Sequence, residues 1–185
     1  MNKIKFLFFM LVSAFALTAC GSDSDDDPVN TEDPVNTEDP VTTEDLAGAI
    51  AGEYEGTIKL TKDKIMGIKV PEPYEGVFKL EKVDNETVKV VCPKLKAMPG
   101  KNGKPDTTCD GVIIKSKVTK EGDVYSVNAE NVDVKYSMNG RAGHCKGKTE
   151  GTVNGEEIDI NVTLSIKMGP MGTHDIPYNF KGKKK

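Results

Sequence analysis

The chain has 185 residues, a formal net charge of −4 and an apolar fraction of 37%, a composition that allows one modest hydrophobic core. It contains a single arginine, Arg141, and no tryptophan, and its lysines are scattered along the sequence. This composition argues against a groove for nucleic acid, so we expect no nucleic-acid partner.

Residues 1–19 have the organisation of a secretory signal peptide. Lys3 and Lys5 precede an apolar run of 14 residues, from Phe6 to Ala19, and small residues lead to Cys20. A membrane-spanning helix needs about 20 apolar residues, so the run is too short to cross a bilayer. The sequence therefore predicts export.

The residues around Cys20 predict where the exported protein is held. Leu17-Thr18-Ala19-Cys20 resembles the lipobox of bacterial lipoproteins, which implies cleavage before Cys20 and a diacylglycerol on its thiol as the membrane anchor. An ordinary signal peptide with a nearby cysteine is the alternative. The acidic residues 21–27 resemble the export signal of Bacteroidota lipoproteins, which implies an outer membrane lipoprotein exposed on the cell surface; a plain polar tether is the alternative.

Residues 20–45 are expected to form a lipidated, disordered tether. A six-residue unit at residues 32–37 recurs at residues 38–43, and between Ser22 and Asp45 there are ten acidic residues and no basic one. Regular prolines and repelling charges keep such a segment extended. The remaining domain, residues 46–185, holds 23 basic and 19 acidic residues and is therefore mildly positive.

Residues 46–185 predict an all-β fold. Apolar residues recur at every second position, as in Ile158, Ile160 and Val162, which puts one wet face and one buried face on each strand. Only residues 45–51 fit a helical turn. We expect eight strands, at residues 53–62, 73–83, 86–96, 109–120, 123–136, 146–154, 157–168 and 174–182. This number favours a closed antiparallel barrel, with a β-sandwich as the alternative.

Two of these strands repeat one another. Residues 54–60 and 74–80 agree at five of seven positions, and each has a glycine, Gly56 or Gly76, at mid-strand on the inward parity. A glycine there allows a sharp bend or a close backbone contact. Duplication and convergence on one strand pattern both explain the likeness.

Three motifs in this domain, together with the lipobox and acidic linker, resemble the calycin-like lipoproteins of Bacteroidota. They are Gly52-Glu53-Tyr54-Glu55-Gly56-Thr57, Gly151-Thr152-Val153-Asn154-Gly155 and Ile176-Pro177-Tyr178-Asn179-Phe180-Lys181-Gly182-Lys183. The resemblance spans residues 52–183 and implies an eight-stranded, lipocalin-like calycin barrel without a settled activity. Tyr54 stands where lipocalins have tryptophan, and the arginine that would cover that tryptophan is missing.

A barrel of eight strands can just hold one small ligand, so the inward side chains are candidates for ligand binding. They are Tyr54, Ile58, Leu60, Phe78, Leu80, Val90, Ile114, Val134, Val162, Leu164, Tyr178 and Phe180. We expect a non-catalytic binding barrel for a small apolar ligand. In the alternative, these side chains fill the barrel and its outer surface serves adhesion or envelope assembly, with a surface glycan or protein as partner.

Three cysteines besides Cys20 favour a disulfide in an exported protein. Cys92 and Cys109 flank residues 99–103 symmetrically, so a hairpin there predicts a Cys92–Cys109 bridge. Their opposite parities argue against this bridge, and a bulge at Pro93 would bring them to the same face. Pairing of Cys109 with Cys145 is the alternative.

No motif predicts catalysis, a metal or another cofactor. His144 and Cys145 lack a second close ligand pair, and no Gly-x-Ser-x-Gly elbow is present. We therefore expect no enzyme activity. Asp106-Thr107-Thr108 resembles the acceptor for O-glycosylation in Bacteroidota, which implies a glycan on Thr107 in a polar loop.

Overall fold

Eight antiparallel strands pair in a closed ring. The computed structural model describes residues 44–99 and 106–185, so the predicted signal peptide, the lipidated Cys20 and the tether up to residue 43 lie outside the described residues. The strands of the ring are β1 (Gly52–Leu60), β4 (Tyr74–Asp84), β5 (Thr87–Val91), β8 (Ile113–Glu121), β9 (Val124–Met138), β10 (Arg141–Asn154), β11 (Glu157–Lys167) and β12 (Thr173–Lys184).

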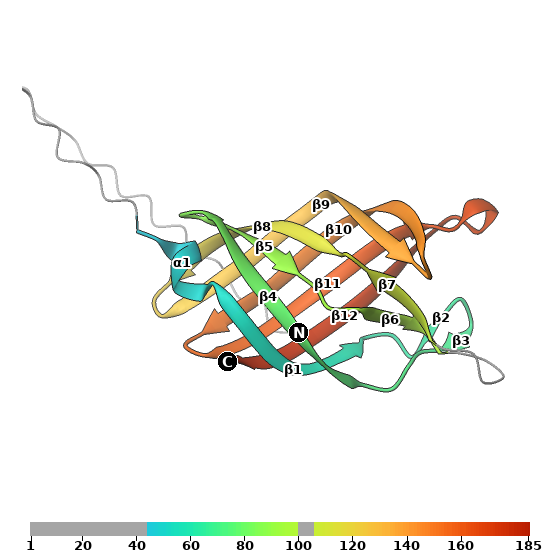
Figure 1. Ribbon diagram of the computed structural model, residues 1–185, viewed down its shortest axis with the longest axis horizontal. Coiled ribbons are helices and arrows are strands. Elements are labelled where there is room, and N and C mark those ends of the chain that lie inside the picture. Colours follow the sequence, from blue (N-terminus) through green and yellow to red (C-terminus); the bar gives the residue numbers. More distant parts are fainter. Residues whose placement is uncertain (1–43, 100–105) are drawn as a thin grey trace, which may run out of the picture. The chain divides into compact units, whose positions relative to one another are not determined.

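The ring closes because β12 pairs with β1 at one side and with β11 at the other. Around it, each strand also pairs with the next in the order just given. Figure 1 shows the strands wrapped obliquely around one core. The predicted all-β, eight-stranded antiparallel barrel is confirmed, and the sandwich alternative is wrong.

Alternating side chains and tight turns explain this fold. In β11 every second side chain, from Ile158 to Ile166, is buried, which is the pattern the sequence predicted. The turn between β9 and β10 is Asn139-Gly140, and both residues have positive φ, 49° and 80°. An Asn-Gly pair tolerates this conformation and so sets the register of the hairpin.

Two expected strands are each broken in two. The strand expected at residues 86–96 ends at Val91, and β6 (Leu95–Met98) follows Pro93. The strand expected at residues 109–120 is divided at Gly111, whose φ is +72°, into β7 (Thr107–Asp110) and β8. Proline removes a backbone donor and positive φ turns the chain, so neither strand continues. The β6–β7 pair is joined to the ring through β7 and β9.

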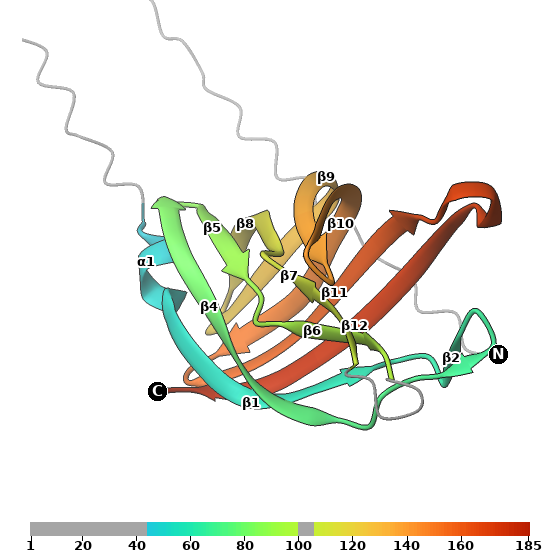
Figure 2. The same ribbon diagram turned by 45° about the vertical axis from the view of Figure 1, so that its right-hand side comes forward.

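The connection between β1 and β4 carries a small hairpin, formed by β2 (Lys64–Ile65) and β3 (Ile68–Lys69). Its turn residues, Met66 and Gly67, both have positive φ. A short 3-10 helix, η1 (Gly169–Met171), lies between β11 and β12. Figures 1 and 2 show the β2–β3 hairpin and the β11–β12 connection at the same end of the barrel.

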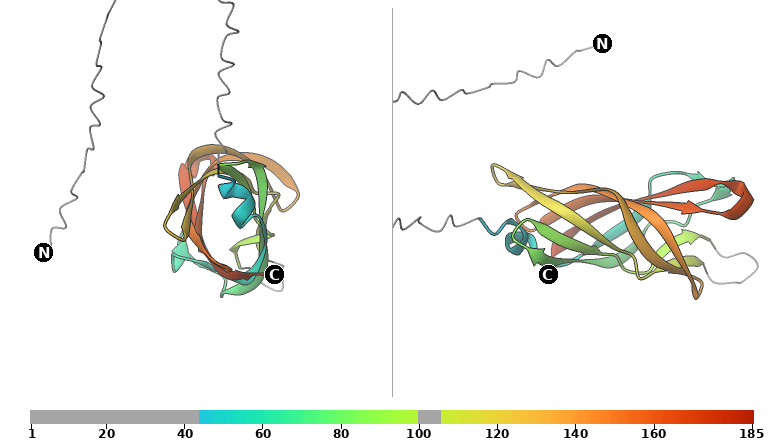
Figure 3. Two further views of the ribbon diagram at one scale, coloured as in Figure 1. Left: turned by 90° about the vertical axis from the view of Figure 1, so that its left-hand side faces the viewer. Right: turned by 90° about the horizontal axis from the view of Figure 1, so that it is seen from above.

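One helical turn, α1 (Leu46–Ile50), lies across the opposite end of the barrel (Figure 3). Asp45 caps it by accepting a hydrogen bond from the Gly48 amide at 2.8 Å. Ala47 and Ile50 are buried, and the Tyr54 hydroxyl donates to the carbonyl of Ile50 at 2.7 Å. The helix therefore supplies side chains to the core. No helix among the described residues is long and apolar enough to cross a membrane.

Candidate functional site

The barrel interior is packed with the chain's own side chains. All twelve predicted inward residues are buried: Tyr54, Ile58, Leu60, Phe78, Leu80, Val90, Ile114, Val134, Val162, Leu164, Tyr178 and Phe180. Together with Ala47 and Ile50 of α1 they belong to one hydrophobic cluster. The rings of Phe78 and Phe180 stack with centroids 4.3 Å apart and planes inclined by 17°. Ligand binding by these residues stays a prediction.

One buried polar atom interrupts this core. The hydroxyl of Tyr178 has no hydrogen-bond partner within the part of the chain that the structure describes, although only 1% of the residue is exposed. Burial, followed by the nearby Cys109, Tyr74 and Cys92, raises the Tyr178 pKa well above its usual range. An unpaired buried hydroxyl costs free energy, so this position calls for an explanation.

The three cysteines of the barrel are buried free thiols, and the predicted Cys92–Cys109 disulfide is not formed among the described residues. The reason lies in the pairing of their strands. Cys109 is opposite Leu95 and Met138, whereas the Cys92 amide donates to the carbonyl of Val112 at 3.0 Å. The β6–β7 pair therefore has a register that sets Cys109 against Leu95 and not against Cys92.

These thiols are poorly suited to nucleophilic chemistry. Burial raises the pKa of Cys109 to about 12, with smaller contributions from Cys145 and Asp110. Burial also raises the pKa of Cys145 to about 11. A reactive cysteine requires the thiolate, so protonated, buried thiols are inert at neutral pH.

Thr107 is not in the polar loop that the sequence predicted. It begins β7, is half-buried and lies opposite Met98. Its neighbour Asp106 forms an ion pair with Lys96 at 3.3 Å. O-glycosylation of Thr107 stays a prediction, but its expected location was wrong.

No group of three or more His, Cys, Asp or Glu residues able to hold a metal ion occurs within residues 44–99 and 106–185. The His174 ring is held at a surface turn, with Nε2 2.8 Å from the carbonyl oxygen of Met171. His144 is exposed on β10.

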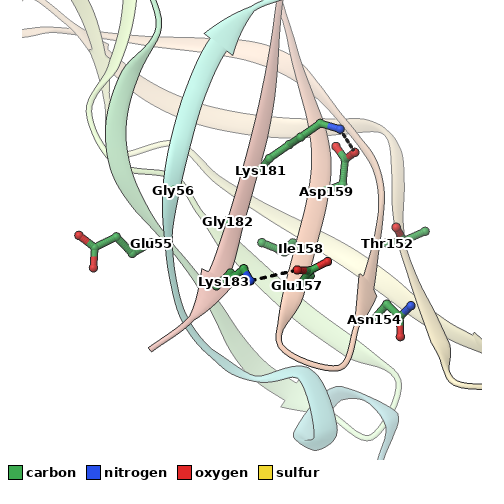
Figure 4. Close-up of a pocket in the computed structure, with 10 residues that line it drawn as sticks. All are labelled: Glu55, Gly56, Thr152, Asn154, Glu157, Ile158, Asp159, Lys181, Gly182 and Lys183. Atoms are coloured by element: carbon green, nitrogen blue, oxygen red, sulfur yellow. Dashed lines mark ion pairs between the residues drawn. The ribbon is translucent and has the colours of Figure 1, made fainter.

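The outer wall carries a groove of about 500 Å³, which we call the polar groove because most of its side chains are charged or polar (Figure 4). Strands β10, β11, β12 and β1 form it, over the backbone of Gly56 and Gly182. Its side chains are Glu55, Thr152, Asn154, Glu157, Ile158, Asp159, Lys181 and Lys183. Ion pairs from Lys181 to Asp159 at 2.7 Å and from Lys183 to Glu157 at 3.2 Å neutralise most of its charge.

A second groove, of about 400 Å³, lies beside the β2–β3 hairpin. We call it the basic groove, and it is lined by Lys59, Leu60, Lys62, Asp63, Lys64, Lys69, Val70, Pro71, Glu72 and Pro73. Its four lysines outnumber its two acids. Sequence analysis missed this site, although four lysines within residues 59–69 were a visible signal.

Comparison with known proteins adds a likeness of fold. No protein-family model matches the chain, and no curated protein matches it significantly. A crystal structure of a "putative outer membrane protein" from Bacteroides fragilis is similar, with a TM-score of 0.50 and 16% identity over 77% of this chain and 54% of that one. This chain thus spans about half the length of that protein, and at this identity the likeness concerns the fold.

Proposed function

We propose that this chain is an outer membrane lipoprotein, held by lipid on Cys20 and exposed on the cell surface, whose filled barrel binds partners through its outer face. Three features support the location: the lipobox, the acidic residues after it, and a fold shared with the "putative outer membrane protein" of Bacteroides fragilis. The proposed role is binding without catalysis.

The packed interior is the observation that carries this proposal. The inward side chains, α1 and the stacked Phe78–Phe180 pair occupy the space in which a lipocalin-like barrel would hold its ligand. The two grooves described above lie on the outside, where charged and hydroxyl side chains are available to a polar partner. This favours the outer-surface alternative over an apolar cargo.

Protease treatment of intact host cells tests the location. We expect added proteinase K to degrade the protein while a periplasmic control protein in the same cells survives. In a matched Cys20→Ser variant the lipid has no attachment point, so the protein should leave the membrane fraction. A wild-type protein that survives treatment of intact cells, but is degraded after lysis, would contradict surface exposure.

A second candidate function rests on the Tyr178 hydroxyl. Because this buried hydroxyl has no partner among the described residues, a small ligand with one polar group that bonds to it is the competing proposal. Organic extraction of protein purified from its own host distinguishes the two. A stoichiometric extracted compound supports an interior ligand, and a clean extract supports the outer-surface role.

A further inference from the structure

We propose that the basic groove beside the β2–β3 hairpin binds an acidic polysaccharide, by its carboxylate or sulfate groups. This inference rests on the proposed outer-surface function and names its site and class of partner. Charge separates the basic groove from the polar groove of Figure 4, where three acids face two lysines. In the basic groove four lysines face two acids.

The pattern of ion pairs also distinguishes the basic groove from the polar groove. Most lysines in the described residues have an acidic partner, as Lys181 and Lys183 do. Lys59, Lys62 and Lys64 form no ion pair in the described structure. Positive charge that is not held in an ion pair attracts anions to this groove.

The hairpin holds two of these charges together. Lys64 of β2 is directly opposite Lys69 of β3, and like charges in this arrangement repel. Glu72 relieves Lys69 through an ion pair at 2.9 Å, which leaves Lys64 without such relief. Lys62 is placed by a hydrogen bond from its Nζ to the carbonyl of Asp175, at 3.3 Å. An anion bound between these ammonium groups would reduce their repulsion.

The lining of the basic groove favours a sugar polymer over other polyanions. Val70 and Pro73, which are not buried, give it apolar surface, against which the C–H faces of sugar rings can pack. The described residues that line it include no aromatic residue and no arginine, so they offer no platform on which a nucleic-acid base could stack. A concave site also suits a single extended chain better than a flat bilayer.

The position of the basic groove leaves it accessible. The described chain begins at Glu44, just before α1, and Figures 1 and 2 show the β2–β3 hairpin at the other end of the barrel. Glu44 and α1 therefore lie away from the basic groove.

Binding of polygalacturonate to the purified full-length chain in detergent tests the inference. The site variant is Lys62→Gln with Lys64→Gln. The matched control is Lys115→Gln with Lys135→Gln, which removes two exposed lysines that also lie outside any described ion pair. Neutral dextran, heparin, phosphatidylglycerol vesicles and a single-stranded DNA oligomer complete the set of probes.

We expect the wild type and the control to bind polygalacturonate with the same affinity and to bind heparin with the same affinity. Neither protein should bind dextran. The affinity should fall as NaCl is raised above about 0.1 M, where charges are screened beyond about 10 Å. The site variant should bind about 30-fold more weakly, as two lost lysine contacts imply. Unchanged binding by the site variant, equal loss in the control, or binding of only vesicles or DNA would overturn the inference.

Failure here is distinct from failure of the proposed function. If the protein is degraded on intact cells but does not bind acidic polysaccharides, only the assignment of the basic groove is overturned. A protein that binds polygalacturonate through Lys62 and Lys64 yet is protected in intact cells retains the groove and overturns the surface location.

Discussion

Gly56 of β1 and Gly76 of β4 are direct cross-strand partners. The two similar segments, residues 54–60 and 74–80, therefore pair with each other about these glycines. On its other side Gly56 is opposite Gly182 of β12, so three neighbouring strands lack an inward side chain at one level. A Cβ on Gly56 would lie 2.0 Å from the carbonyl oxygen of Lys181, which shows how closely the backbones approach.

Replacing Gly56 with alanine should be much more harmful than replacing Gly76. At Gly56 the new methyl meets rigid backbone, whereas at Gly76 it meets the flexible end of Ile58 at 2.5 Å. We expect Gly56→Ala to lower the free energy of unfolding by about 3 kcal/mol and Gly76→Ala by about 1 kcal/mol, measured by urea denaturation. Equal losses would contradict the close approach of β1 and β12.

Removing the unpaired hydroxyl should stabilise the barrel. We expect Tyr178→Phe to raise the free energy of unfolding by about 1 kcal/mol, because the unfolded tyrosine is hydrated and the folded one has no partner. Tyr54→Phe is the matched control. It should lower the free energy of unfolding by about 1 kcal/mol, because it removes the hydrogen bond to the Ile50 carbonyl. A destabilised Tyr178→Phe would mean that water or a ligand holds this hydroxyl.

Thiol titration checks the state of Cys92, Cys109 and Cys145. Since all three are buried and free, an aromatic disulfide reagent at pH 8 should find almost no reactive thiol in the native protein. In denaturant without reductant the reagent should react with three thiols, because the predicted lipid blocks the fourth, that of Cys20. A single reactive thiol under denaturation would show that a bridge forms in the native protein.

Stability should fall at alkaline pH. Burial raises the pKa of Cys109 from 9.0 to about 12 and that of Tyr54 from 10.0 to about 12. These groups lose their protons more readily when unfolded, so the native state binds more protons between pH 9 and 12 and becomes less stable as pH rises through this window. Chemical denaturation at pH 8, 10 and 11 should show a falling midpoint. A constant midpoint would contradict the burial of these groups.

The barrel could be predicted from sequence because one wet and one buried face leave a period of two in each strand. The breaks at Pro93 and Gly111 were not predicted, although a proline and the Asp110-Gly111 pair are both signals that a strand ends. Both breaks also change which residues face inward. Just before Pro93 the buried residues have even numbers, as Cys92 does; between the breaks they have odd numbers, as Leu95 and Cys109 do; and just after Gly111 they have even numbers again, as Val112 does. A bulge was expected at Pro93, where the structure has the end of a strand.

The site was harder to predict for two physical reasons. Inward side chains such as Phe78 and Phe180 have the same alternation whether they line a cavity or stack against one another. Lys62, Lys64 and Lys69 follow the end of β1 in a segment without a long strand, and only the β2–β3 hairpin brings Lys64 opposite Lys69. The sequence shows their charge, but it does not show that they are arranged around a groove.

Native mass spectrometry of the lipoprotein purified from its own host most directly tests whether the barrel is filled by its own side chains. We expect one species with the mass of the lipidated chain, and no small molecule released when the barrel unfolds. A stoichiometric additional mass, lost on unfolding and reduced in Tyr178→Phe, would instead show that the interior holds a ligand and would contradict the filled barrel.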